Sequence, residues 1–154
     1  MAGLKDRIRE DLTAAMRAKD EVAKSTLRSV LTAISKAEVS GKAQTTLSDD
    51  QVIGVIRSEL GKRKEAAEIY AQAGRDELAS RENAEAEVLA PYLPAEMGAE
   101  ELSAIVAEEI DRVRGGGVEG PRAMGAVIKA VRERVGARAE GSRIAQAVKA
   151  GLGI

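Results

Sequence analysis

Residues 47–73 read LSDDQVIGVIRSELGKRKEAAEIYAQA, and this stretch carries the clearest local structural signal in the chain. Ser48 and Gln51 stand three residues apart, which is the spacing of a capping box at the start of a helix. Apolar residues then recur at helical spacing until Gly74 provides a stop. The pattern predicts one long helix over residues 49–73.

Shorter stretches with helical periodicity lie on both sides of this long helix. We expect a helix cap at Asp20 and a polar loop over residues 42–46. Gly115-Gly116-Gly117 lacks the Lys-Ser/Thr pair of a phosphate-binding loop and is interpreted as a linker between helices. The remaining helices are predicted at about residues 4–18, 21–41, 76–90, 99–114, 121–135 and 141–151.

A proline pair divides this series of helices. Pro91 and Pro94 each fix their own φ and restrict the residue before them, so residues 91–94 predict a stiff connector. The sequence therefore predicts an all-α protein with an N-terminal multi-helix domain, residues 1–92, followed by a small C-terminal three-helix bundle, residues 95–154.

The composition excludes most reactive chemistry. The chain of 154 residues has no Cys and no His, so it lacks thiol nucleophiles, disulfides, thiolate metal sites and imidazole bases. No G-x-x-x-x-G-K-[ST] motif is present to hold ATP phosphates. We expect no catalytic residues, no metal site and no cofactor.

Long apolar segments are also missing from the sequence. The N-terminus runs directly into charged residues, and the longest stretch without charge, residues 88–95, has eight residues where a membrane span needs roughly 20. These observations predict a cytoplasmic protein with no membrane partner.

The net charge of −1 conceals a strong asymmetry along the chain. Residues 76–111 hold 11 Asp and Glu against one Arg, whereas residues 121–154 hold seven Lys and Arg against two Glu. The basic tail can neutralise RNA phosphates, and its lack of aromatic residues favours structured RNA over single strands. Two alternatives stay open, namely an ordinary surface and docking on the chain's own acidic segment. The candidate nucleic-acid-binding residues are Lys129, Arg132, Arg138, Arg143 and Lys149.

A second polar cluster is predicted in the N-terminal domain, and its alternative is a helix surface with i,i+4 pairs. Its candidate residues are Ser25, Arg28, Lys62, Arg63 and Arg75. The nearby acidic run of Glu82, Glu85 and Glu87 is interpreted as a solvated face or as partners for Arg28, Lys62 or Arg63, and not as a metal site.

Three glycines inside predicted helices call for an explanation, because glycine costs about 1 kcal/mol against alanine there. We expect Gly54, Gly61 and Gly125 to mark close contacts between helices.

Several segments resemble one known family. Residues 25–28 (STLR) and 62–70 (KRKEAAEIY) resemble YqeY-like proteins. Residues 124–128 (MGAVI) and 136–141 (GARAEG) resemble the tail module shared with the B subunit of the glutamine-dependent aspartyl/glutamyl-tRNA amidotransferase. The likeness covers nearly the whole chain in order, with one departure at Gly98, where a Ser or Thr cap is expected.

This GatB/YqeY resemblance implies an all-helical protein with a C-terminal three-helix domain that helps to hold tRNA. We expect a non-catalytic helper that binds tRNA, or that associates with the amidotransferase or aminoacyl-tRNA synthetase machinery. The family resemblance also implies a carbon–nitrogen ligase with glutamine as amide donor, acting alone or as an accessory subunit, and the missing nucleophile speaks against it. A third hypothesis is a protein-interaction module that uses the acidic segment 76–111.

Overall fold

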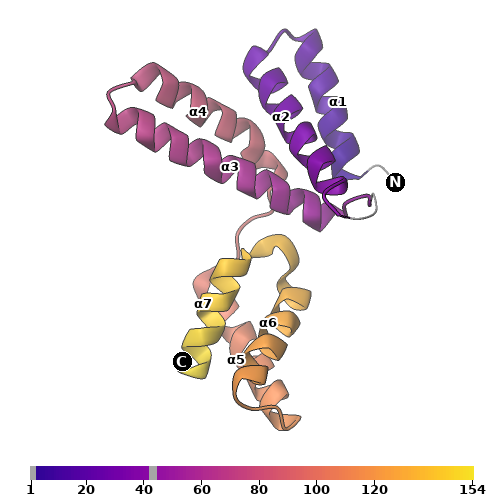
Figure 1. The fold of residues 1–154 in the computed structure, drawn as a ribbon, viewed down its shortest axis with the longest axis vertical. Helices are drawn as coiled ribbons and strands as arrows, with labels where there is room; N and C mark the ends of the chain where they lie inside the picture. The colour runs from indigo at the N-terminus through magenta and orange to yellow at the C-terminus, as the bar shows by residue number, and fades with distance from the viewer. Residues whose placement is uncertain (1–2, 42–44) are drawn as a thin grey trace. The chain divides into compact units, whose positions relative to one another are not determined.

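The computed structural model describes residues 3–41 and 45–154, so residues 42–44 of the predicted loop lie outside the described part. The described residues form seven α-helices and two 3₁₀ helices without a β-strand, which confirms the all-α prediction. They divide into two compact units, one ending at Leu93 and one running from Pro94 to Ile154 (Figure 1). Among the described helices, none has an apolar stretch long enough to cross a lipid bilayer.

The first unit consists of two helical hairpins, one made of α1 and α2 and the other of α3 and α4 (Figure 1). The long helix predicted at residues 49–73 spans Asp49–Gln72 in the structure. The elements are α1 (Leu4–Arg17), α2 (Glu21–Glu38), α3 (Asp49–Gln72), α4 (Asp76–Leu89) and the 3₁₀ helix η1 (Ala90–Tyr92).

Local sequence signals set the starts of two of these helices. Ser48 Oγ accepts the Gln51 N–H at 3.2 Å and the Gln51 side chain accepts the Ser48 N–H at 2.9 Å, so the predicted capping box is confirmed. Asp20 caps α2 by accepting the Ala23 N–H at 3.1 Å, as predicted. Each cap satisfies backbone donors that the helix itself leaves unpaired.

The core of the first unit lies where the two hairpins meet. Aliphatic side chains from all four helices pack there, and the buried residues of α3 and α4 outside this core include the small side chains of Ala67 and Ala79. The buried core residues are Ile8, Leu27, Val30, Ile34, Val52, Ile56, Leu89 and Tyr92.

Tyr92, the last residue of the predicted N-terminal domain, packs as part of the core of the first unit. Its side chain is 9% exposed and belongs to the first core, its hydroxyl donates a hydrogen bond to Asp11, and the Arg7 guanidinium lies 4.9 Å from its ring centroid. A phenol buried with a hydrogen-bond partner and a cation over its ring is held in place. The first unit therefore includes η1.

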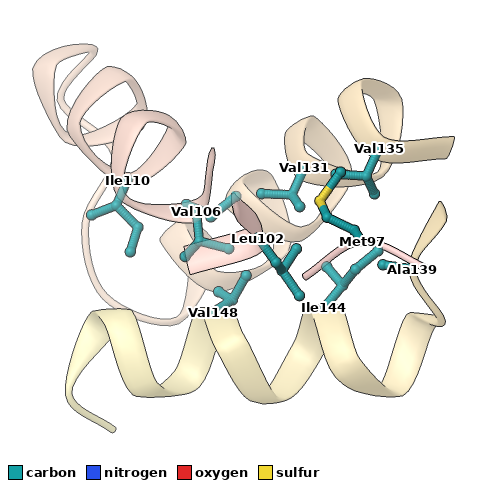
Figure 2. Close-up of a cluster of buried hydrophobic side chains, with 10 residues drawn as sticks. Met97, Leu102, Val106, Ile110, Val131, Val135, Ala139, Ile144 and Val148 are labelled. Carbon is teal, nitrogen blue, oxygen red and sulfur yellow. The ribbon is translucent and has the colours of Figure 1, made fainter. Parts of the chain in front are cut away.

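The second unit is a three-helix bundle. Its elements are α5 (Ala99–Gly115), α6 (Pro121–Val135), the 3₁₀ helix η2 (Gly136–Arg138) and α7 (Gly141–Leu152). Figure 2 shows its core, in which Val106, Val131 and Val148 represent the three helices. Met97 precedes α5 and is 2% exposed, and its N–H donates to the Arg138 carbonyl at 2.8 Å. Gly98 stands at the cap of α5 without a side-chain hydrogen bond.

The glycine predictions are wrong in this structure. A Cβ at Gly54, Gly61 or Gly125 would meet no atom within 4 Å outside its own helix, because these residues face open space. Gly151 is the close contact that the sequence did not reveal. A Cβ there would lie 2.8 Å from Cδ1 of Ile110, so α7 can approach α5 because this side chain is missing.

Candidate nucleic-acid interface

The five cations proposed for RNA binding fall into two groups in the second unit. Lys129, Arg132 and Lys149 are exposed and form no ion pair with any described residue. Arg138 and Arg143 are held by partners within the unit. The structure therefore brings the predicted residues into one small bundle, but it leaves only three of them free.

Arg138 and Arg143 both fix the segment that enters α5. Arg143 is half-buried and donates from Nη2 to the Met97 carbonyl at 2.9 Å. Arg138 Nη2 lies 3.1 Å from Oε2 of Glu101, and the Arg138 carbonyl accepts the Met97 N–H. Charge-assisted contacts of this kind order backbone that has no helical partner. Arg143 therefore has a structural use, whereas the Arg138–Glu101 ion pair joins side chains that are 50% and 52% exposed and contributes little by itself.

Arg134 of α6 also has a structural use. Its Nη1 lies 2.7 Å from Oε2 of Glu108 and 3.2 Å from Oε1 of Glu109, whose side chain is 1% exposed. The hydrogen bonds that Arg134 donates to Glu108 and then to Glu109 raise the pKa of Arg134 above its usual value. A carboxylate this deeply buried needs such a cation, because an unpaired buried charge is very costly.

Two cations of the basic tail form ion pairs with the chain's own acidic segment. Arg134 and Arg138 pair with Glu108, Glu109 and Glu101, which belong to the acidic segment 76–111. Docking of tail cations on the chain's own acidic segment therefore occurs within the second unit. These ion pairs also occupy the carboxylates of Glu101, Glu108 and Glu109, which a basic protein partner would need.

The three cations without a partner, Lys129, Arg132 and Lys149, lie on α6 and α7, which pack against each other. Arg132 of α6 stands beside the start of α7, since a Cβ on Gly141 would lie 2.8 Å from its Nη2. Lys129 is one turn away on α6, and Lys149 is two turns beyond Gly141 on α7. Arg122 at the start of α6 is likewise exposed and unpaired among the described residues. RNA binding through these residues stays a prediction.

The cluster predicted in the first unit is not one site. Arg63 is 11% exposed and lies 3.0 Å from Oε2 of Glu59 and 3.2 Å from Oε2 of Glu85. The second of these ion pairs joins α3 to α4 and was among the partners predicted for the acidic run. Lys62 is 68% exposed and pairs with Glu59 at 3.4 Å. Arg75 stands exposed at the cap of α4.

Ser25 and Arg28 belong elsewhere, in a groove between α2 and α4. The groove has a volume of about 560 Å³ and is lined by Glu21, Lys24, Ser25, Arg28, Ser29, Thr32 and Arg81. Sequence reasoning missed Lys24 and Arg81. Lys24 lies four residues before Arg28 on one helix face, which is a signal that could have been used. Nothing in the sequence pairs Arg81 of α4 with α2.

Shifted pKa values in this structure have structural causes. The Lys5 ammonium, hydrogen-bonded to Glu38 at 2.6 Å, and then the Leu47 N–H lower the pKa of that carboxyl. Burial and then the hydrogen bond to Asp11 raise the pKa of Tyr92. In the part of the chain that the structure describes, no group of three acidic, His or Cys side chains is arranged to hold a metal ion.

Comparison with known proteins gives a family. The model of the family described as "Yqey-like protein" matches residues 5–152. The chain is 35% identical over 86 residues to "Altered inheritance of mitochondria protein 41, mitochondrial" of Clavispora lusitaniae, which is 56% of this chain and 49% of that protein. The protein of that name in Pyrenophora tritici-repentis is 27% identical over 131 residues, covering 83% of this chain and 71% of the relative.

A third relative of the same name, from Vanderwaltozyma polyspora, is 30% identical over 86 residues, covering 56% of this chain and 46% of its own length. The chain thus spans about half the length of the first relatives. None of the three names mentions a catalysed reaction. All three are named as mitochondrial proteins, which contradicts the prediction of a cytoplasmic location. The match over nearly the whole chain assigns this protein to the YqeY-like family.

Proposed function

We propose that this protein is a non-catalytic helper that binds tRNA through the second unit, in the service of tRNA amidation or aminoacylation. The observation that carries the proposal is the set of free cations on α6 and α7. Lys129, Arg132 and Lys149 are exposed and unpaired among the described residues, whereas the neighbouring arginines are used internally. Exposed cations without a protein partner are available to phosphates.

The chemistry of the side chains supports the non-catalytic half of the proposal. Glutamine hydrolysis needs an activated nucleophile, and the sequence has neither Cys nor His. The shifted pKa values belong to Glu38, Tyr92 and Arg134, which are held in ion pairs and hydrogen bonds that stabilise the fold. If the purified protein released ammonia from glutamine, this half of the proposal would be wrong.

The salt dependence of tRNA binding tests the other half. Each phosphate contact contributes about 0.9 to the slope of log affinity against log salt, so three contacts predict a loss of about 40-fold between about 50 and about 200 mM salt. Because the relatives carry mitochondrial names, mitochondrial tRNA belongs in the assay beside total tRNA.

A triple variant locates the binding surface. Lys129→Ala/Arg132→Ala/Lys149→Ala is expected to weaken binding and flatten the salt slope. The control Arg17→Ala/Lys36→Ala/Lys64→Ala removes the same charge from exposed sites of the first unit. Equal losses in both variants would show that net charge alone drives binding, and an unchanged tail variant would refute the assigned surface.

A further inference from the structure

The groove between α2 and α4 has the chemistry of an anion site and lies in a different unit from the proposed tRNA surface. Its lining holds three cations, Lys24, Arg28 and Arg81, against one carboxylate, Glu21, and no large apolar side chain. Its volume of about 560 Å³ falls within the range of ligand sites, roughly 300–1,000 Å³, and exceeds the size of a single ion.

The groove lies on a polar face of α2 that does not contribute to the core of the first unit. Leu27, Val30 and Ile34 of α2 belong to the core of the first unit, whereas Ser25, Ser29 and Thr32 line the groove along a different face of the same helix. These residues recur at helical spacing and so share one face of α2. The lined part of α2, residues 21–32, is roughly 16 Å long at 1.5 Å per residue.

Several donors on this face have no protein partner. Arg28 forms no ion pair, and the Ser25 and Ser29 hydroxyls form no hydrogen bond, with the described residues. Thr32 differs, because its hydroxyl donates to the Arg28 carbonyl at 3.0 Å and can therefore only accept from a ligand.

The remaining charges in the groove are held only weakly. Lys24 pairs with Glu21 at 3.0 Å, and Glu21 is 72% exposed. Arg81 lies 3.5 Å from Glu85, whose other oxygen is already 3.2 Å from Arg63. Each pair has one exposed member, Glu21 at 72% and Arg81 at 62%, and solvent screening weakens such pairs, so an anion can draw Lys24 and Arg81 away from them.

We propose that this groove binds the phosphate group of a phosphorylated ligand larger than inorganic phosphate itself. Phosphate oxygens accept several hydrogen bonds at once, and arginine guanidinium with hydroxyl donors is a set that matches them. The ligand is a small phosphorylated molecule or the phosphodiester backbone of RNA. The site stands on the residues of the first unit and does not depend on RNA binding by α6 and α7.

Titrations of the full-length protein, followed by amide NMR at constant ionic strength, test the groove. The probes are pyrophosphate and tRNA, with chloride as the reference anion. We expect saturable shifts at α2 residues 24–32 and at Arg81 with at least one phosphate probe. Pyrophosphate binding identifies a small ligand, and a response to tRNA alone identifies the RNA backbone. If neither pyrophosphate nor tRNA shifted these signals more than chloride does, the proposal would be overturned.

Single substitutions separate the groove from general charge. Arg28→Ala and Arg81→Ala are each expected to weaken binding by about tenfold, since each removes a charge-assisted contact. Arg17→Ala removes an exposed arginine outside the groove and is expected to have no effect. Equal weakening by all three would overturn the proposal. The Lys129/Arg132/Lys149 variant keeps this groove, so loss of its tRNA binding leaves the pyrophosphate result untouched.

Discussion

The ion pair between Arg63 and Glu85 offers a quantitative test of how α3 and α4 are held together. The two side chains are 11% and 12% exposed, the Nε–Oε2 distance is 3.2 Å, and the helices otherwise bury small side chains there, including Ala67 and Ala79. Removing one partner of a buried pair costs about 3–5 kcal/mol when the other charge is left alone. The expected cost therefore depends on what each partner retains.

The two substitutions differ in what they leave behind. Arg63→Ala leaves Glu59 and Glu85 without their shared cation, and Glu85 keeps only Arg81 at 3.5 Å, so we expect a loss of about 3 kcal/mol. Glu85→Ala leaves Arg63 paired with Glu59 at 3.0 Å, so the expected loss is smaller, about 1–2 kcal/mol. Lys62 is an exposed neighbour that also pairs with Glu59, so Lys62→Ala is expected to lower the free energy of unfolding by under about 0.5 kcal/mol.

The aromatic residues provide a selective assay. The two tyrosines, Tyr70 and Tyr92, both belong to the first unit, and the chain has no Phe or Trp. Tyrosine fluorescence or near-UV circular dichroism therefore follows the first unit alone during urea unfolding, whereas far-UV circular dichroism follows both units. A double-mutant cycle with Arg63→Ala and Glu85→Ala should give a coupling of about 1 kcal/mol or more. If Arg63→Ala were no more harmful than Lys62→Ala, the pair would behave as a surface contact and the reasoning would fail.

Three further outcomes are expected. Lowering the pH should destabilise the first unit as Glu38 becomes protonated. The folded-state pKa of Glu38 is lowered from 4.5, so the stability that its carboxylate contributes is present above pH 4.5 and is lost as the pH falls through the folded-state pKa. Tyrosine-detected melting between pH 6 and pH 3 checks this, and the stability of Glu38→Gln should depend less on pH. Gly151→Val should destabilise the second unit by about 1–3 kcal/mol through overlap with Ile110 and Val106, with far-UV unfolding altered and the tyrosine transition unchanged. Gly125→Ala should be stabilising by about 0.5–1 kcal/mol, because its Cβ position is open and glycine is unfavourable inside a helix; a destabilised variant would restore the rejected idea of a close contact at Gly125.

The helices could be predicted from the sequence because their signals are local. The Ser48–Gln51 capping box, the Asp20 cap and the Pro121 start each involve residues within one turn, and all three occur in the structure. The glycine contacts could not be predicted in this way, since whether a Cβ fits depends on which helix lies opposite. Gly151 faces Ile110, a residue 41 positions away, and nothing near Gly151 in the sequence reveals this.

The sequence predicted which cations the candidate site contains, but not which of them are paired within the protein. Counting charges identified the basic tail, but it could not separate Lys129, which is free, from Arg138 and Arg143, which hold the segment before α5. The difference arises because η2 and α7 lie beside Met97, whose N–H donates to the Arg138 carbonyl. The groove of Lys24, Arg28 and Arg81 was missed for the same reason, because it is formed by two helices that are distant in sequence.

The anchoring of Met97 sets how much chain is left between the two cores. Leu93 still packs on the first core, and Met97 is already fixed in the second by its buried side chain and two backbone hydrogen bonds. Only Pro94, Ala95 and Glu96 separate them, and the two sets of core residues have no member in common. A protease site engineered among these three residues would therefore lie outside both sets of core residues.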